Sequence, residues 1–249
     1  MSRLLLVSNR LPVTSRRAGG QVILSSGGAG GLVAGLGPIH QEGNGLWFGI
    51  MKDGHRPEIR EQLESRRLVS VPVPAADARR HYRGYSNGAI WPLFHYLQDQ
   101  ADFTSVDFQS YRRVNALFAD AIAARAAPGD LIWIHDYHFL LLPQMLRERV
   151  PAAKIGFFLH IPFPSSEVFR LLPHREEILR GLLGANLIGL HTYDYSRHLV
   201  SSFRRVLAVE FDQHWVAENG YNCRIGVFPM GIDVVGFRRR LGSPQVPQY

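Results

Sequence analysis

Residues 130–164 read DLIWIHDYHFLLLPQMLRERVPAAKIGFFLHIPFP, and this segment predicts the architecture. Residues 131–134 and 155–159 are apolar runs of strand length, typical of strands buried on both faces in a parallel sheet. Residues 138–150, between them, can form a helix with an apolar side. The segment therefore predicts one strand–helix–strand unit, whose crossover should be right-handed.

Polar residues stand where these two strands end: His135 and Asp136 after the first, and His160 after the second. In open α/β sheets, ligands bind in the crevice beyond the carboxyl ends of the strands. We therefore expect two histidines and an aspartate to point into one cleft, although strand alternation puts His135 and Asp136 on opposite faces.

The rest of the chain continues this pattern. Further segments of strand character lie at residues 3–8, 46–50, 67–73, 186–191, 209–216 and 221–227. Helical patterns lie at residues 57–64, 75–82, 103–126, 173–183 and 193–207. Residues 11–26 are expected to form a loop or a hairpin, and residues 234–249 resemble a linker. The fold class that fits this order is α/β, with a largely parallel sheet flanked by helices.

The composition is that of a globular protein. The chain has 249 residues, of which 46% are hydrophobic, enough for the core of one large domain or two small ones. Cys223 is the only cysteine, which excludes an internal disulfide and a cysteine-based metal site and favours a reducing, cytoplasmic location. Residues 1–9 lack the apolar region and cleavage site typical of a signal peptide, and no apolar run approaches the ~20 residues of a membrane span, so we expect no membrane partner.

The formal net charge of +7 comes from arginines, since Lys52 and Lys154 are the only lysines. The basic residues are scattered in pairs, and no basic patch interleaved with aromatic residues of the nucleic-acid-binding kind occurs. We attribute most of these pairs to solvated surfaces and the arginine bias to genome composition. No nucleic-acid partner is expected.

A glycine-rich turn, GGAGG at residues 27–31, leads into a helix. Exposed N–H groups in such a turn, together with the helix dipole, can hold a phosphate, but a flexible loop has the same composition. The dinucleotide-binding fingerprint fails because Val33 stands where its third glycine belongs. Both interpretations of the turn stay open.

Residues 85–96, YSNGAIWPLFHY, are rich in aromatic side chains and are interrupted by Gly88 and Pro92. We expect a loop that caps the core. The alternative is a sugar-binding platform, because the faces of tryptophan and tyrosine stack on sugar C–H bonds while their polar tips bind hydroxyls.

Several common catalytic patterns are missing from the sequence. No zinc-binding spacing joins the histidines near the strand ends, which are His135, His138, His160 and His191. No D-x-D pair suggests a metal-held diphosphate, and no G-x-S-x-G elbow suggests a serine hydrolase.

An acidic side chain, Asp136, an arginine at a strand end, Arg10, and the glycine turn remain. The carboxylate can accept hydrogen bonds from sugar hydroxyls, and a guanidinium can clamp a phosphate. Taken singly, Asp136 fits a helix N-cap and Arg10 fits a surface ion pair at least as well. Together these residues suggest a phosphosugar cleft.

Eight motifs occur in an order that is similar to a known enzyme family. They are SNR at 8–10, GGAGGL at 27–32, GLWFG at 45–49, YSNGAIWPLFHY at 85–96, YRRVN at 111–115, IWIHDYH at 132–138, GFFLHIPFP at 156–164 and PMGID at 229–233. The chain resembles the N-terminal half of the trehalose-6-phosphate synthases, retaining glycosyltransferases of the GT-B type with two Rossmann-like domains. The resemblance implies a Rossmann-like, acceptor-side domain at residues 1–235 and a linker toward a C-terminal domain at residues 236–249.

The resemblance also implies roles for individual residues. Gly30 and Gly31 would contact the nucleotide-sugar donor, usually UDP-glucose. The residues that would hold the acceptor, glucose 6-phosphate, are Arg10, Tyr82, Trp91 and Asp136. His160 and Asp136 would be the catalytic residues, with His160 near the transferred glucose. The resemblance implies no metal or other cofactor, and the donor's own phosphate would help to deprotonate the acceptor hydroxyl.

The second domain of the family, which neutralises the donor diphosphate, has no counterpart in these 249 residues. Because several charge-assisted phosphate contacts would be lost, each worth roughly 1.5–3 kcal/mol, we expect the isolated chain to be inactive without a C-terminal domain. The alternative function is a non-catalytic phosphosugar-binding or regulatory module. A dinucleotide-dependent oxidoreductase is disfavoured by the failed glycine fingerprint.

Overall fold

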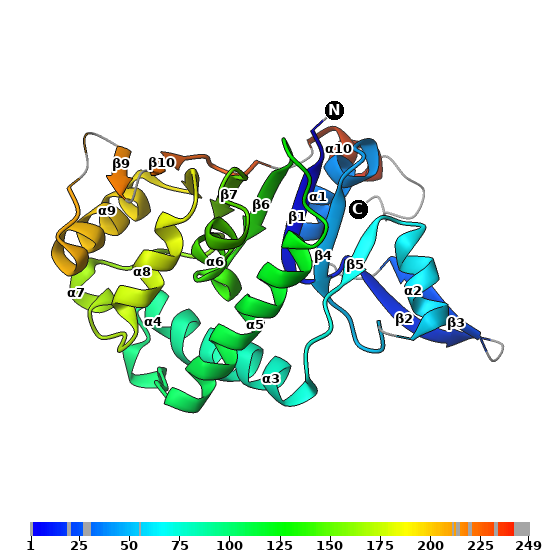
Figure 1. The fold of residues 1–249 in the computed structure, drawn as a ribbon, viewed down its shortest axis with the longest axis horizontal. Coiled ribbons are helices and arrows are strands. Elements are labelled where there is room, and N and C mark those ends of the chain that lie inside the picture. Colours follow the sequence, from blue (N-terminus) through cyan, green and yellow to red (C-terminus); the bar gives the residue numbers. More distant parts are fainter. Residues whose placement is uncertain are drawn as a thin grey trace.

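Eight strands of the described chain form one sheet, in the order β5-β4-β1-β6-β7-β8-β10-β9 (Figure 1). The computed structural model describes residues 2–18, 21–26, 31–54, 56–210, 212, 215–218, 221–231 and 234–241. The strands of the sheet are β1 (Leu4–Arg10), β4 (Leu46–Ile50), β5 (Leu68–Ser70), β6 (Leu131–His135), β7 (Lys154–Phe158), β8 (Leu187–Leu190), β9 (Trp215–Glu218) and β10 (Tyr221–Val227). Neighbouring strands are parallel except for the β9–β10 pair at one edge, which confirms the predicted, largely parallel sheet.

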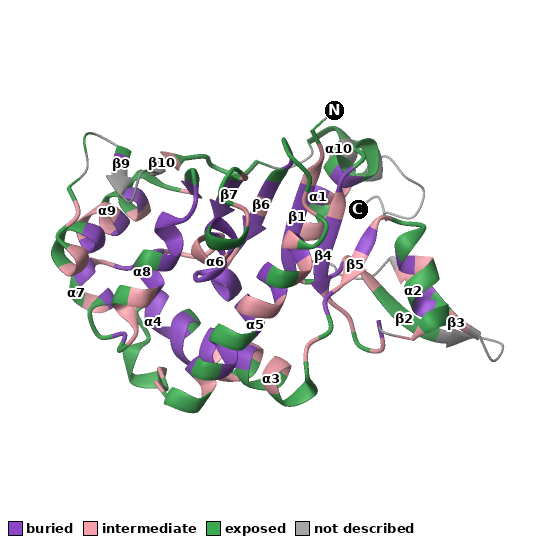
Figure 2. Cartoon of the chain, in the orientation of Figure 1, coloured by how far each residue is buried: buried purple, intermediate pink, exposed green. Residues whose placement is uncertain are grey.

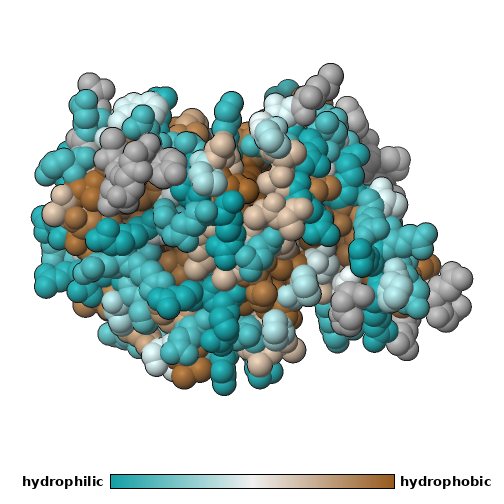
Figure 3. Space-filling view, viewed as in Figure 1, coloured by the Kyte–Doolittle hydropathy of each residue, from teal (hydrophilic) through white to brown (hydrophobic). Residues whose placement is uncertain are grey.

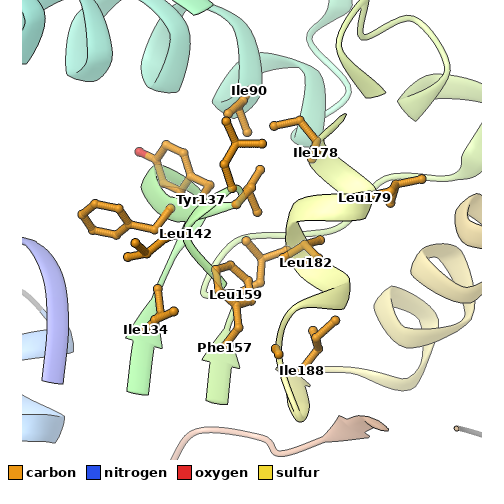
Figure 4. Packing of buried hydrophobic residues seen from close by; sticks show 14 of the residues in the cluster. Ile90, Ile134, Tyr137, Leu142, Phe157, Leu159, Ile178, Leu179, Leu182 and Ile188 are labelled. Atoms are coloured by element: carbon orange, nitrogen blue, oxygen red, sulfur yellow. The ribbon is translucent and has the colours of Figure 1, made fainter. Parts of the chain in front are cut away.

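The predicted strand–helix–strand unit lies in the middle of this sheet. β6 and β7 pair with Ile132 beside Ile155 and Ile134 beside Phe157, and all four side chains are buried. In Figure 4, Ile134 and Phe157 gather with Ile188 and with side chains from the neighbouring helices in one apolar layer. Burial of this layer explains why the two segments read as continuous apolar runs.

Helices pack on the sheet, and α5 (Ser105–Ala123), α6 (Leu142–Arg149) and α8 (Arg175–Leu183) lie over it in Figure 1. The others are α1 (Gly31–Glu42), α2 (Pro57–Glu64), α3 (Ala75–Arg79), α4 (Trp91–Phe94), α7 (Ser166–Phe169), α9 (Tyr193–Leu207) and α10 (Val234–Leu241). Buried residues follow the strands and the inner faces of the helices (Figure 2), and hydrophilic side chains cover much of the outer surface (Figure 3). Among the described residues, no helix combines the length and the apolar character that crossing a membrane requires.

Residues 75–94 differ from the prediction of a short helix followed by a loop. After α3 the chain continues as the π-helix η1 (Arg80–Ile90) and then as α4, without a break. Pro92 has no N–H to donate within this segment, and the carbonyl of Gly88, four residues earlier, accepts instead from the N–H of Asp102 (2.8 Å). The expected position against the core is confirmed, since the side chains of Tyr85, Ile90, Leu93 and Phe94 are fully buried.

Three other segments also differ from, or sharpen, the prediction. The helix expected at residues 138–150 is divided into a 3-10 turn, η3 (Tyr137–Phe139), and α6, because Pro143 fits only the first turn of a helix. Residues 11–26 form the hairpin alternative, with β2 (Val13–Ala18) antiparallel to β3 (Gln21–Ser26). At residues 234–241, where a linker was expected, the chain forms α10.

A buried arginine joins α6 to the strands on either side of α8. The guanidinium of Arg147 donates to the carbonyls of Gly184, Pro151 and Ala153, and to the side chain of Asn186. Asn186 in turn accepts from the N–H of Ile155 at the start of β7. The buried charge is therefore compensated by oxygen acceptors at the amino-terminal edge of the sheet, away from the ends where polar ligands bind.

The contact between α8 and the start of α6 predicts the effect of a small substitution. A methyl group at Gly181 would lie 2.5 Å from the carbonyl oxygen of Leu140 and 2.8 Å from Cα of Leu141. We expect Gly181→Ala to lower the unfolding free energy by about 1–3 kcal/mol, although alanine is the better helix former. Urea denaturation of the chain measures this value.

The control is Gly31→Ala, because an added Cβ there meets nothing within 4 Å. The unfolding free energy of this variant should stay within about 0.5 kcal/mol of the original value. A Gly181→Ala protein as stable as the unmodified chain would show that α8 does not pack backbone-to-backbone on α6.

Candidate functional site

The strand order places the topological switch point of the sheet between β1 and β6, where the ligand crevice of an open α/β sheet is expected. From this pair, the sheet runs through β4 to β5 on one side and through β7 to β8 on the other. Ligands of open α/β sheets bind at such a switch point, beyond the carboxyl ends of the strands. β1 ends at Arg10, and Asp136 directly follows β6, so both predicted residues lie at this position.

Asp136 links the ends of β6 and β7. Its N–H donates to the carbonyl of Phe158 (2.8 Å), and its carboxylate accepts from the N–H of His160 (3.2 Å). The backbone has φ 80° and ψ 170°, a region that is strained for any residue except glycine. The alternative that Asp136 caps the next helix is not seen, because its side chain makes no N-cap hydrogen bond.

Burial raises the pKa of Asp136 to about 6, against the opposing effect of hydrogen bonds from the N–H groups of Tyr137 and His160. The carboxylate is therefore mostly ionised at pH 7 and can accept hydrogen bonds from ligand hydroxyls. A perturbed carboxyl group in a strand-end crevice is a common feature of functional sites.

Three flat groups stack at the end of β1. The guanidinium carbon of Arg10 lies 4.7 Å from the ring centroid of Tyr82, and the Tyr82 ring is nearly parallel to that of His138, with 5.6 Å between centroids. Arg10 itself is exposed and forms no salt bridge within the described part of the chain. The surface ion pair considered for Arg10 is therefore absent there, and its charge stays available to an anion.

Hydrogen bonds hold the helix that carries Tyr82 against the residues after β6. The Tyr137 hydroxyl donates to the Asn87 side chain (2.8 Å), whose amide donates to the carbonyl of Tyr82 (2.7 Å). The Tyr111 hydroxyl donates to the carbonyl of Tyr137 (2.7 Å). The sequence analysis did not predict these hydrogen bonds. A signal for the bond between Tyr137 and Asn87 is that both residues lie in polar motifs, HDYH and YSNG, beside apolar segments.

Trp91 lies further along the same helical segment. The residue is 37% exposed, and its ring stacks on His95 with 4.1 Å between centroids. No ring contact joins Trp91 to Tyr82 among the described residues. The exposed face leaves the sugar-platform interpretation open for Trp91, while the rest of the segment belongs to the core.

A row of histidines follows the ends of β6, β7 and β8. Nδ1 of His135 lies 3.0 Å from Nε2 of His160, and the rings of His160 and His191 are 5.7 Å apart. Burial lowers the pKa of His135 to about 3 and that of His160 to about 4, and it also lowers the pKa of His191. All three imidazoles are neutral at pH 7.

The expectation that His135 points into the cleft is wrong. Its side chain is only 1% exposed and packs against Trp133, with 4.5 Å between ring centroids, whereas Asp136 and His160 are half-buried. Strand alternation does place His135 and Asp136 on opposite faces of the sheet, and it is the contact with Trp133 and His160 that covers the His135 ring. Among the described residues, no group of three or more histidine, cysteine or acidic side chains could hold a metal ion.

The predicted donor site is only partly described. Gly31 is the first residue of α1, and nothing lies within 4 Å of the position where its Cβ would be. Gly30 lies outside the described residues. The role of this turn therefore stays a prediction.

A large hollow lies elsewhere and contains none of the predicted site residues. It has a volume of about 1480 Å³ and is lined mainly by apolar side chains of β5, α2, α3 and α5. Converging polar groups and perturbed carboxyl groups mark a site more reliably than size does, and they occur at the β1–β6 crevice.

Comparison with known proteins identifies the family. The sequence pattern of glycosyltransferase family 20 matches residues 2–249. The chain belongs to this family. The predicted fold, a Rossmann-like N-terminal domain of the GT-B type, and the resemblance to the trehalose-6-phosphate synthases are thereby confirmed.

Individual relatives in family 20 support the same conclusion. The UDP-forming alpha,alpha-trehalose-phosphate synthase of Yarrowia lipolytica is 42% identical over 260 residues, which include 100% of this chain and 55% of the relative. An E. coli structure, described as trehalose-6-phosphate bound with UDP-2-fluoro glucose, matches with TM-score 0.81 and 30% identity over 98% of this chain and 52% of that one.

A UDP-forming alpha,alpha-trehalose-phosphate synthase from Burkholderia xenovorans, in complex with glucose-6-phosphate, matches with TM-score 0.79 and 26% identity. The match covers 98% of this chain and 54% of that one. The chain therefore spans about half the length of these family 20 relatives.

The buried histidines of this site predict how stability depends on pH. Burial lowers the pKa of His81, a fully buried residue whose Nε2–H donates to the carbonyl of His138, to about 4. When a group binds its proton more weakly in the folded state, the folded protein loses stability as the pH falls from 6.5 toward the folded-state pKa of that group. We expect His81 alone to lower the unfolding free energy by roughly 2 kcal/mol between pH 7.5 and pH 5.

Urea denaturation at these two pH values, for the unmodified chain and for His81→Phe, measures this effect. The variant should lose less stability, because phenylalanine keeps the ring and Asn115 still donates to the carbonyl of His138. In both proteins the raised pKa of Asp136 has the opposite effect, because protonation of this carboxylate adds stability as the pH falls. Equal losses in the two proteins would contradict the assignment.

Proposed function

We propose that this chain is the acceptor-side half of a trehalose-6-phosphate synthase. The complete enzyme would transfer glucose from UDP-glucose to glucose 6-phosphate, with retention at the anomeric carbon, and would release UDP. One observation carries the proposal: Arg10 and Asp136 end adjacent strands at the switch point of the sheet, with Tyr82 stacked under Arg10. An exposed cation and an ionised carboxylate at one crevice are what a phosphosugar requires.

The acceptor would bind through contacts of two kinds. Arg10 would pair with the phosphate through its guanidinium fork, while Tyr82 holds that fork in place. Asp136 would accept hydrogen bonds from the sugar hydroxyls, and the exposed face of Trp91 would pack on the sugar ring. The Burkholderia xenovorans relative in complex with glucose-6-phosphate supports this choice of acceptor.

The donor would lie against α1 and the end of β7. Gly30 and Gly31 would bring backbone N–H groups to the diphosphate at the helix N-terminus. His160 and Asp136 would act as the catalytic residues beside the transferred glucose. The UDP-forming Yarrowia lipolytica relative and the E. coli structure with UDP-2-fluoro glucose support this choice of donor.

The transfer step uses no protein nucleophile. The acceptor hydroxyl oxygen bonds to the anomeric carbon as the bond from that carbon to the UDP oxygen breaks, and the hydroxyl proton passes to the departing phosphate. Attack and departure on one face of the sugar give retention. The contribution of the protein is to orient the two substrates and to stabilise the developing charge.

Glucose 6-phosphate should bind the isolated chain through Arg10. Isothermal titration calorimetry should show a Kd that is roughly ten- to hundredfold weaker for Arg10→Ala, because one charge-assisted phosphate contact is lost. The matched control is Arg60→Ala, which removes an exposed arginine of α2 that pairs with Glu64. Equal affinity in all three proteins, or no binding to the unmodified chain, would contradict the acceptor site.

The isolated chain should not catalyse the reaction. Incubation with UDP-glucose and glucose 6-phosphate should release no UDP above background. The match covers only 55% of the Yarrowia lipolytica relative, so the isolated chain lacks the residues of the other part and the donor diphosphate would face solvent. Clear turnover would show that these 249 residues hold a complete site.

The alternative function, a non-catalytic phosphosugar-binding or regulatory module, can be separated from the synthase half. A chimera would append the portion of the Yarrowia lipolytica relative that extends beyond the match. UDP release by this chimera supports the synthase half. Intact glucose 6-phosphate binding without UDP release favours the module.

A further inference from the structure

His135 has no role in the proposed function, yet it is buried directly against a proposed catalytic residue. Its Nδ1 lies 3.0 Å from Nε2 of His160, a hydrogen-bond distance. Its other ring nitrogen, Nε2, is buried and has no hydrogen-bond partner in the described part of the chain. An unpartnered nitrogen of this kind requires an explanation.

A hydrogen bond between two neutral imidazoles has two possible directions. In the first, His135 donates from Nδ1–H, so its buried Nε2 is a bare lone pair and His160 accepts at Nε2. In the second, His160 donates from Nε2–H, so His135 must carry its own proton on the buried Nε2. The second direction leaves an N–H donor buried without an acceptor.

The two directions differ in free energy because of this orphaned group. Among buried backbone groups, N–H donors without a partner are rarer than acceptors with an unused lone pair, and we apply the same order to the two imidazole nitrogens. The burial that lowers the pKa of both rings keeps them neutral at pH 7, so charging either ring does not resolve the problem. The first direction is therefore favoured.

The same choice fixes the ligand-facing side of His160. A neutral imidazole has one proton, so a His160 ring that accepts at Nε2 must carry its proton on Nδ1. Nδ1 of His160 makes no hydrogen bond within the described residues and is not among the buried atoms. It therefore presents a free N–H at the crevice.

We propose that His135 is a positioning residue that fixes His160 as the Nδ1-protonated tautomer, so that His160 offers a hydrogen-bond donor to a ligand oxygen. The ligand class is a sugar hydroxyl or a phosphoryl oxygen, and only this part rests on the proposed function. The assignment of the tautomer rests on the histidine pair alone.

The surroundings of the pair hold it in this orientation. Trp133 packs on the His135 ring, Phe158 contacts His160, and the N–H of His160 is bound by the Asp136 carboxylate. His191 touches the ring of His160 without a hydrogen bond to it. His191 therefore supplies a matched control, since it contacts the same ring but cannot set its tautomer.

Nitrogen NMR of the histidine rings tests the proposal on the unliganded chain. Long-range proton–nitrogen correlation of the ¹⁵N-histidine-labelled protein at pH 7 distinguishes an Nδ1–H ring from an Nε2–H ring. The His160 signals are assigned by their loss in His160→Gln. We expect the Nδ1–H pattern for His160 in the unmodified chain and the same pattern in His191→Phe.

In His135→Phe, which keeps an aromatic ring at the buried position, His160 should lose the fixed Nδ1–H pattern and shift toward Nε2–H. An Nε2–H pattern in the unmodified chain would overturn the proposal and would show that His135 carries its proton on the buried Nε2. An unchanged Nδ1–H pattern in His135→Phe would also overturn it. If His135→Phe does not fold, the pattern of the unmodified chain still decides the direction of the bond.

No ligand or turnover is needed for this experiment, so its outcome is separate from that of the proposed function. A fixed Nδ1–H tautomer in a chain that fails to bind glucose 6-phosphate would uphold the role of His135 and reject the acceptor site. Binding of glucose 6-phosphate with His160 in the Nε2–H form would do the reverse.

Discussion

Two hydrogen bonds between the ends of β6 and β7 hold the rest of the site in place. The N–H of Asp136 binds the carbonyl of Phe158, and the Asp136 carboxylate binds the N–H of His160. The chain can leave β6 in this way only with φ near 80° at Asp136, a strain of about 1–3 kcal/mol for a residue with a side chain. That turn sets the position of His138, on which Tyr82 and then Arg10 stack. Loss of these two hydrogen bonds would therefore displace both the Arg10 guanidinium and the Asp136 carboxylate.

Much of the fold was predictable because apolar spacing depends on local geometry. The limits of α2 (Pro57–Glu64) and α9 (Tyr193–Leu207) agree with the sequence prediction, since each combines helical spacing with a clear start. The π-helix η1 was not predictable. Gly88 and Pro92 indicated a loop, and the helix forms because Tyr85 and Ile90 are buried against distant elements. Tertiary packing there overrides local preference.

The candidate site was predictable at the strand ends and not beyond them. Arg10 and Asp136 follow from the rule for parallel sheets, because each directly ends a strand. The stack of Tyr82 on His138 joins residues 56 positions apart, and no local pattern encodes it. The burial of His135 depends on its contacts with Trp133 and His160, which strand alternation alone does not reveal. The lowered pKa values of the histidines and the raised pKa of Asp136 are likewise products of tertiary burial.

The central position of β1 has a consequence for synthesis on the ribosome. β1 lies between β4 and β6, so its first partner begins at Leu46 and its second only at Leu131. At translation rates of about 5–20 residues per second, one edge of this apolar strand stays unpaired for roughly 4–17 s while the intervening chain is made. During that interval the nascent chain presents an open strand edge, the kind of surface that chaperones bind and that promotes aggregation.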